Sequence, residues 1–448
     1  EQIEAYAEEV SSDPLVPELN SKVTVKKVKD DVYGAQLITL SNGIRVHVLK
    51  TDYSPNNISM QAVSWGGSSL YPNSEYNLAD NASLVQIGGW GQFSAIDLQK
   101  KLSGKQASVS PSISDRTEAL HGACVKKDLE TMLQLTYLCF TSPRKDDEAY
   151  NSMLERVRNS LKNADMNPAT ALSDSVASVV YNNNVRAVRL RAEDVDDLSY
   201  DRIMEIYKER FANASDFEFY FVGDVDADSI MPLLTEYLGS LPVAKKGEKY
   251  RVVDQRMTKG ERTCIFQKEQ DTPNAICNFI YHAPMAYNLK NIVMLSMLKQ
   301  SMQMLYTEKV REDEGGAYSV PVSGRLVDYP EKYATIQIKL PTSPDKLERM
   351  TQVIYEGIES LCTEGPSEDY LQKIREYMVR AHAEDLKDND YWMSQLVQRT
   401  RFGRNMVDGY DDVVRNVTVA DLKALACKIF KSGNRLVVGM VTPPAEDK

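Results

Sequence analysis

The order of expected secondary structure repeats along the chain, and this repeat constrains the fold more than any other sequence feature. Both halves run from strands into a helix, then through further strands and helices to a last strand. The first series ends on Phe221-Val222-Gly223-Asp224 and the second on Val437-Val438-Gly439-Met440. We interpret the repeat as an internal duplication of two α+β units, each of about 200 residues.

Two periodicities support this interpretation. From Ala334 to Leu340, apolar residues alternate with Thr335, Gln337 and Lys339, which predicts a half-buried strand. From Asn288 to Glu312 the apolar residues recur with helical spacing. The predicted fold class is α+β, with two homologous α/β-sandwich domains, each a mostly antiparallel sheet packed by helices.

Breaks in these patterns set the expected domain boundaries. Residues 1–35 are interpreted as a connector or tail, 36–242 as the first domain and 263–448 as the second. The intervening residues 243–262 are polar and lysine-rich without periodicity, which is typical of a linker. A chain of 448 residues exceeds the roughly 250–300 residues that a single hydrophobic core supports, so two domains are expected.

Composition excludes several classes of function. The net charge of −11 argues against nucleic acid and anionic membrane as partners. The longest mainly apolar run, Ile292 to Leu298, is far shorter than the roughly 20 residues of a membrane-spanning helix. Residue 1 is Glu, and we expect that a preceding part of the protein is missing from this chain.

The sequence also lacks a recognisable catalytic or metal-binding set. Its four histidines, His47, His121, His282 and His382, are not spaced for a shared helical metal site. His47 alternates with the apolar face of its strand and is expected to be exposed. No Gly-x-Ser-x-Gly motif is present. The residues therefore predict no catalytic group and no metal ligand.

Several strings, in their order and spacing, resemble the insulinase/pitrilysin family of zinc metallopeptidases, the inverzincins. They are Leu40-Ser41-Asn42-Gly43-Ile44-Arg45-Val46, Trp65-Gly66-Gly67 leading to Asn77-Leu78-Ala79, Gly88-Gly89, and Phe221-Val222-Gly223-Asp224 leading to Leu238-Gly239-Ser240-Leu241-Pro242. The resemblance covers roughly residues 36 to 445 and implies the family's fold.

The zinc motif of the family is missing at the matching position. In this family a helix carries His-x-x-Glu-His, whose two histidines bind zinc while the glutamate activates water. Here the corresponding stretch is Asp80-Asn81-Ala82-Ser83-Leu84. A third ligand, a glutamate in the family, would fall near Asn159 to Leu161, where no carboxylate stands. The resemblance thus implies no cofactor in this chain and a zinc ion in a missing N-terminal half.

A second family feature is retained. The segment from Val310 to Val320 resembles the one in which an Arg, and a Tyr seven residues later, reach the substrate at the zinc site. Carried over, these substrate-binding residues are Arg311 and Tyr318. An Arg at a helix C-terminus can donate two hydrogen bonds to a substrate carbonyl, and a Tyr hydroxyl can donate to a developing oxyanion. The alternative interpretation is a surface Arg and a strand Tyr after a glycine turn.

The leading hypothesis is a non-catalytic C-terminal half of a zinc metalloendopeptidase, inactive alone, that closes a chamber around an unfolded peptide. Its partner would be the zinc-bearing N-terminal half. The alternative is a stand-alone non-catalytic subunit or structural partner of a separate zinc-bearing chain. A third is a peptide-binding scaffold without proteolysis. By analogy with exported bacterial relatives, the periplasm or cell envelope is the expected location.

Overall fold

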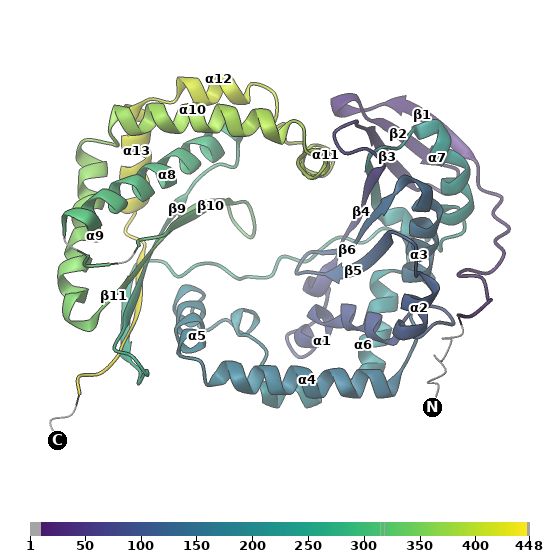
Figure 1. Ribbon diagram of the computed structural model, residues 1–448, viewed down its shortest axis with the longest axis horizontal. Helices are drawn as coiled ribbons and strands as arrows, with labels where there is room; N and C mark the ends of the chain where they lie inside the picture. The colour runs from purple at the N-terminus through teal and green to yellow at the C-terminus, as the bar shows by residue number, and fades with distance from the viewer. Residues whose placement is uncertain (1–9, 314, 318, 446–448) are drawn as a thin grey trace, which may run out of the picture. The chain divides into compact units, whose positions relative to one another are not determined.

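The computed structural model describes residues 10–313, 315–317 and 319–445, and they form two compact units. Unit 1 comprises the chain up to Leu161, Leu190–Val252 and Lys387–Phe402. Unit 2 comprises Lys162–Arg189, Val253–Leu386 and the chain from Gly403 onward. Each unit contains its own sheet and helices (Figure 1).

The sheet of unit 1 has seven strands in the order β1-β2-β3-β7-β4-β6-β5. Their bounds are β1 Val25–Asp30, β2 Gln36–Leu40, β3 Arg45–Lys50, β4 Asn57–Trp65, β5 Ala107–Ile113, β6 Thr117–Val125 and β7 Glu218–Gly223. Only β3 and β7 pair in parallel among these strands, and the other neighbours are antiparallel. Strand β1 lies within the range that the sequence predicted as a connector.

The sheet of unit 2 has five strands in the order β10-β11-β9-β12-β8. They are β8 Glu261–Gln267, β9 Ala275–Pro284, β10 Val322–Val327, β11 Tyr333–Thr342 and β12 Arg435–Val441. Again one pair, β8 with β12, is parallel. Reading from β8, the order β8-β12-β9-β11-β10 reproduces β3-β7-β4-β6-β5 of unit 1. The same topology in both units confirms the predicted fold class and supports the duplication.

Helices cover one face of each sheet. In unit 1 these are α1 Tyr76–Asp80, α2 Ala95–Lys101, α3 Leu129–Thr141, α6 Tyr200–Arg210 and α7 Ala227–Leu233, while α4, Asp147–Asp165, runs from unit 1 into unit 2. In unit 2 they are α8 Leu289–Glu312, α9 Leu347–Thr363, α10 Glu368–Asp385, α12 Tyr410–Asn416 and α13 Val419–Phe430. Helix α8 begins where Asn288 caps it, since the side chain of Asn288 accepts a hydrogen bond from the N–H of Asn291 at 2.8 Å.

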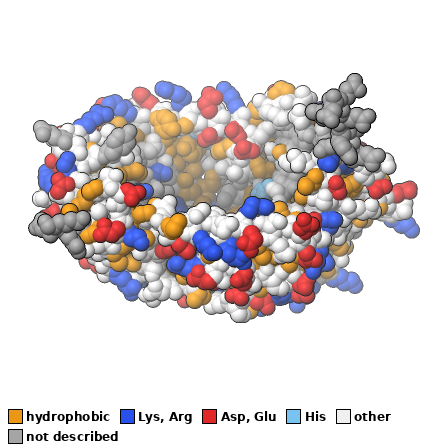
Figure 2. Space-filling model, turned by 60° about the horizontal axis from the view of Figure 1, so that its bottom comes forward, with side chains coloured by type: hydrophobic (Ala, Val, Ile, Leu, Met, Phe, Trp, Pro, Cys, Tyr) orange, Lys and Arg blue, Asp and Glu red, His pale blue; other side chains and the backbone are white. Residues whose placement is uncertain are grey.

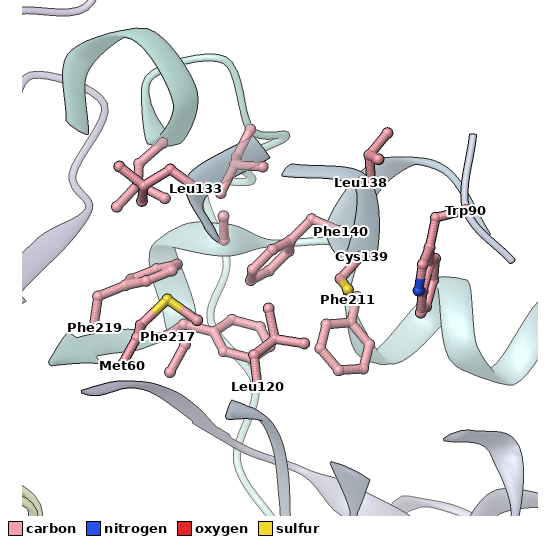
Figure 3. Close-up of a cluster of buried hydrophobic side chains, with 14 of the residues drawn as sticks. Met60, Trp90, Leu120, Leu133, Leu138, Cys139, Phe140, Phe211, Phe217 and Phe219 are labelled. Carbon is pink, nitrogen blue, oxygen red and sulfur yellow. The ribbon is translucent and has the colours of Figure 1, made fainter. Parts of the chain in front are cut away.

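The core of unit 1 is rich in aromatic rings (Figure 3). The ring of Phe140 on α3 meets the ring of Phe217 edge to face, with centroids 4.8 Å apart, and Phe211 packs beside both. These rings are at most 6% exposed. Edge-to-face contacts stabilise a core beyond the burial of area, so this cluster holds α3 and α6 against the sheet.

Each sheet receives one helix from the opposite half of the sequence. Helix α5, Pro168–Val180, belongs to unit 2, and α11, Asn389–Phe402, belongs to unit 1. On β7, Tyr220 and Val222 pack with α11, whereas the alternate residues Phe219 and Phe221 lie in the main core. Because side chains alternate across a strand, α11 covers the second face of its sheet.

Helix α5 does the same for unit 2. Its Leu172 packs against Val438 and Met440 of β12, while Val437 of the same strand lies in the main core. Helix α11 follows α10 in sequence as α5 follows α4, so the exchange is reciprocal. This exchange of helices was not predicted from the sequence.

The surface is charged and mixed. Lys and Arg side chains are interspersed with Asp and Glu on the face seen in Figure 2. Among the described helices, none combines the length and the apolar character needed to cross a membrane.

Candidate functional site

The segment that matches the family's zinc motif does not form a regular helix. Helix α1 ends at Asp80, and the chain continues from Ala82 to Gly88 as a 3-10 helix. The amide of Asn81 donates to the carbonyl oxygen of Asn77 at 2.8 Å, which ties this side chain to the backbone. The spacing of Leu78, Ala82 and Val85 predicts one helix from about Asn77 that stops at Gly88, and the structure instead divides this stretch at Asn81.

This segment does not fit a zinc ion. Zinc sites in proteins use His, Cys, Asp or Glu, and the segment offers the carboxylate of Asp80 alone. Ala82, inside the segment, is completely buried and supplies no donor. Within the described ranges of the chain, no three His, Cys, Asp or Glu side chains come together as a metal site would require.

A buried contact between Glu118 and Arg210 holds the loop that precedes this segment. The carboxylate of Glu118, 1% exposed, accepts a hydrogen bond from the N–H of Gly67 at 2.8 Å and lies 3.5 Å from the guanidinium of Arg210. Burial raises the pKa of Glu118 to about 8, against the opposing effects of Arg210 and the Gly67 N–H. Gly67 has φ +61°, and a Cβ there would lie 2.3 Å from the carbonyl oxygen of Ser114. The double glycine is therefore required by the tight fit of this loop.

The histidines do not share a site. His282 contacts the carbonyl oxygen of Thr258 at 2.7 Å, and His382 stacks on Tyr410 with ring centroids 4.0 Å apart. His121 is exposed.

His47 differs from its expected exposure. It is 1% exposed, with Nδ1 2.5 Å from Asp31 and Nε2 2.7 Å from Glu218. The expectation failed because this face of β3 is covered: the ring of His47 stacks on Tyr220 with centroids 4.8 Å apart, and Leu49 of the same face packs in one cluster with Met393 and Leu396 of α11.

The retained substrate-binding segment begins at the C-terminus of α8. Arg311 lies in the last turn of this helix and is exposed, so its guanidinium can reach a ligand. The second predicted residue, Tyr318, lies outside the described residues. Between them the chain turns through Gly315 at φ +78° and the buried Gly316, where a Cβ would lie 2.2 Å from the sulfur of Met350.

Two contacts anchor the chain on either side of residue 318. The side-chain amide of Gln303 on α8 donates to the carbonyl oxygen of Val320 and accepts from the N–H of Val322, both at 3.0 Å. The hydroxyl of Thr342 on β11 donates to the carbonyl oxygen of Gly316. Sequence reasoning missed Gln303 and Thr342, because a polar residue on an amphipathic helix or strand carries no local signal of a distant partner.

Unit 2 also contains a cavity of about 570 Å³ between α5 and the sheet. Apolar side chains of α5 form one wall, including Leu172, Val176 and Val180. The floor is the outward face of β9, β10 and β11, where Arg325 and Lys339 lie. The alternation of polar and apolar residues from Ala334 to Leu340 predicted a polar face of β11. It could not indicate that α5 would cover that face.

The described residues form two units of the same topology. The segment Asp80–Leu84, which matches the family's zinc motif, does not fit a zinc ion. Residues 197–378 match the family model described as the peptidase M16 inactive domain. Over these residues the chain is similar to inactive M16 peptidase domains, and the resemblance to the insulinase/pitrilysin family is confirmed.

Among curated proteins the relatives are zinc proteases of PqqL type. The chain is 24% identical over 416 residues to the zinc protease PQQL-like of Arabidopsis thaliana, covering 89% of this chain and 39% of the relative. It is 22% identical over 417 residues to the probable zinc protease PqqL of Haemophilus influenzae, covering 91% and 44%. The chain thus spans less than half the length of these relatives.

Solved structures share the fold. The periplasmic protease PqqL of Escherichia coli superposes with a TM-score of 0.85 at 18% identity, covering 99% of this chain and 49% of that one. The first half of the same protease gives 0.73 at 14% identity, covering 93% and 94%. A protease from Helicobacter pylori gives 0.74 at 16% identity, covering 94% of this chain and 100% of that one.

Proposed function

We propose that this chain is the non-catalytic C-terminal half of a zinc metalloendopeptidase. In this proposal the half closes the substrate chamber and contacts an unfolded peptide, while the zinc ion and its ligands belong to an N-terminal half. The observation that carries the proposal is the match to an inactive peptidase domain in a chain whose segment Asp80–Leu84 lacks zinc ligands.

The assignment to the C-terminal half has separate support. Two structures of E. coli PqqL can be compared, the protease itself and its first half alone. This chain superposes on the protease with a TM-score of 0.85 and on the first half with 0.73. The difference in TM-score favours a match to the remaining half. The length of the chain, less than half that of its curated relatives, agrees with this.

Arg311 and Tyr318 are the proposed substrate contacts. Arg311 is exposed at the end of α8, and the chain around residue 318 is anchored through Gly316 and Val320. A guanidinium can hold a peptide carbonyl with two hydrogen bonds, and a phenol can donate to the oxyanion that develops as the peptide bond is attacked. Pre-organised donors of this kind lower the barrier without reorganising during the reaction.

A second candidate function is a stand-alone non-catalytic subunit that pairs with a separate zinc-bearing chain. The likeness to the Helicobacter pylori protease favours it, because this chain covers all of that shorter protein. The coding sequence upstream of Glu1 distinguishes the two candidates. A continuous reading frame that contains His-x-x-Glu-His supports one polypeptide, whereas a nearby start codon or signal peptide supports a subunit.

We also propose the periplasm as the location. The support is that the E. coli structural relative is described as a periplasmic protease.

The test of the substrate contacts uses the assembled enzyme, with the zinc-bearing half present. Arg311→Ala and Tyr318→Phe are each expected to lower kcat by about 100-fold, the usual effect of removing one oxyanion donor. Arg380→Ala and Tyr377→Phe, two exposed residues of α10, are matched controls and should leave kcat unchanged. Unchanged kcat in the Arg311 and Tyr318 variants would remove both residues from the substrate site.

A further inference from the structure

The cavity of unit 2 has chemistry that the proposed contacts of Arg311 and Tyr318 do not use. Its volume of about 570 Å³ lies within the range of ligand-binding pockets in proteins. All of its lining residues belong to unit 2, from α5, the three strands β9, β10 and β11, and the residues Tyr181 and Met257.

The lining is divided between an apolar wall and a polar floor. The wall is the face of α5 that carries Leu172 and Val176. On the floor, the side-chain amide of Gln337 donates to the oxygen of Asn278 at 2.9 Å, which fixes both amides. A ligand here therefore meets apolar surface on one side and fixed hydrogen-bonding groups on the other.

The charges of the cavity have one sign. Arg325 and Lys339 line it and are exposed, and none of the described lining residues is acidic. No ion pair joins either cation to a described carboxylate. The cavity therefore favours an anionic ligand.

The two cations are separated by a defined length of strand. Arg325 pairs with Thr335 across the β10–β11 ladder, and Lys339 lies four residues further along β11. Four residues of strand correspond to about 13 Å. In an extended peptide, side chains at positions i and i+4 lie on the same face with this same spacing.

We propose that this cavity is a binding site for an extended peptide segment that carries carboxylates at positions i and i+4, one facing Arg325 and the other facing Lys339. Apolar residues at i+1 and i+3, which lie on the opposite face of the extended peptide, pack against Leu172 and Val176 of α5. This assignment rests on the proposed function in that it takes the ligand to be a peptide, and it names the substrate class as acidic.

The test measures peptide binding to the whole chain by fluorescence anisotropy, without a zinc-bearing half. Two labelled peptides of about ten residues carry Val at i+1 and i+3 and either Glu or Gln at both i and i+4. The chain should bind the Glu peptide at least about tenfold more tightly than the Gln peptide, as expected for two charge-assisted contacts. Arg325→Gln combined with Lys339→Gln should abolish this preference.

The control has the same net charge change outside the cavity. Arg380→Gln combined with Lys346→Gln alters two exposed cations of unit 2 that do not line the cavity, and the preference should persist. A lack of preference in the unmodified chain, its survival in the Arg325/Lys339 variant, or its loss in the control would each overturn the proposal. If the double variant melts at a lower temperature than the unmodified chain, the single Lys339→Gln variant replaces it in the test. The preference for the Glu peptide over the Gln peptide should then fall at least about threefold.

A second variant tests the cavity by its volume. Ala177→Trp places a large ring in the space beside α5 and should weaken binding of both peptides, with an unchanged melting temperature as the check on folding. Peptide binding that is undiminished in this variant would place the site elsewhere. The binding test measures no cleavage, and the test of Arg311 and Tyr318 measures kcat. A negative result in either test therefore does not contradict the proposal that the other one examines.

Discussion

At the scale of single residues, His47 shows how burial and pairing compete. Burial alone would lower the pKa of His47, but hydrogen bonds and charge from Asp31 and Glu218 outweigh burial and raise it. The pKa of Asp31 is lowered in turn, mainly by the hydrogen bond from His47 against the effect of burial. When it is protonated, His47 on β3 therefore joins Asp31, the residue after β1, to Glu218 on β7 through two ion pairs.

This arrangement predicts a pH-dependent stability. A raised pKa in the folded state gives stabilisation that is complete below the unfolded value of about 6.5 and fades as pH rises through the folded value. His47→Gln should lower the free energy of unfolding by about 3 kcal/mol at pH 6, the usual cost of breaking a buried ion pair, and by less at pH 9. Urea denaturation at the two pH values measures this.

His121→Gln is the control in the same unit. His121 is exposed, and the two variants should differ in how their destabilisation changes with pH. Equal loss of stability at pH 6 and pH 9 in His47→Gln would mean that the imidazole is neutral in the folded protein.

At the scale of elements, the predicted helix from Asn288 to Glu312 agrees with α8, Leu289–Glu312, because both its cap and its apolar stripe are local. The predicted helix from Asn77 was wrong at its centre. Small and polar residues at Asn81 and Ser83 weaken the helix there, and the tertiary fit of the buried Ala82 and Val85 decides the 3-10 geometry. Local patterns thus predict long amphipathic elements better than short buried ones.

Gln303 is a positioning residue whose effect can be separated from substrate contact. Gln303→Leu removes both hydrogen bonds to the chain at Val320 and Val322, so the segment near residue 318 loses an anchor. We expect kcat of the assembled enzyme to fall about tenfold with KM nearly unchanged, and the free energy of unfolding to fall by about 1–3 kcal/mol.

Gln300→Leu is the matched control on the same helix, where the side chain bonds to Ser296 instead. Equal kinetics in the two variants would show that the anchor has no role in catalysis. A kcat of Gln303→Glu above that of Gln303→Leu would support the anchoring role, because the carboxylate keeps an acceptor for the Val322 N–H.

The exchanged helix α11 gives a prediction for the first half of the chain. Residues 1–252 alone lack α11, which leaves Tyr220 and Val222 of the sheet uncovered. Burial of Met393 and Leu396 contributes about 3–6 kcal/mol, at roughly 1.5–3 kcal/mol for each side chain. We expect this fragment to bind the dye ANS and to unfold at lower urea concentration. A peptide of residues 387–402 should restore the urea midpoint and remove part of the ANS binding, since the apolar face of α5 stays uncovered.

A peptide with Met393 and Leu396 replaced by Ser is the control and should not rescue the fragment. A fragment that is as stable as the intact chain without the peptide would contradict the importance of the exchange.

At the scale of the whole molecule, the duplication and fold class could be predicted because element order is written along the sequence. The exchange of α5 and α11 could not, because the apolar stripe of a helix does not identify which sheet it covers. Arg311 was identified through family resemblance. The cavity around Arg325 and Lys339 could not be predicted, because one of its walls is α5, which comes from the other half of the sequence. The burial of His47 could not be predicted either, because it depends on α11, which comes from the other half of the sequence and packs with Leu49 on the same face of β3.

The proposed absence of zinc from this chain is directly measurable. After incubation with Zn²⁺ and desalting, elemental analysis should find less than about 0.1 equivalent of zinc, and a chelator should shift the melting temperature by less than about 1 °C, since a ligand that does not bind the folded state cannot stabilise it. The assembled enzyme with its catalytic half is the positive control. One equivalent of zinc retained by the isolated chain would contradict the proposal.

The reciprocal exchange of α5 and α11 also bears on ancestry. A single ancestral unit would have left one face of its sheet bare, because the helix that covers this face comes from the other unit. Two identical copies could close both faces by giving each other that helix, in a symmetric dimer held by mutual donation. Gene fusion would then have joined the two copies in one polypeptide and allowed their sequences to diverge. The two sheets now differ at one edge. In unit 1 the β1–β2 hairpin extends the sheet beside β3, whereas in unit 2 the matching strand, β8, is itself the edge strand.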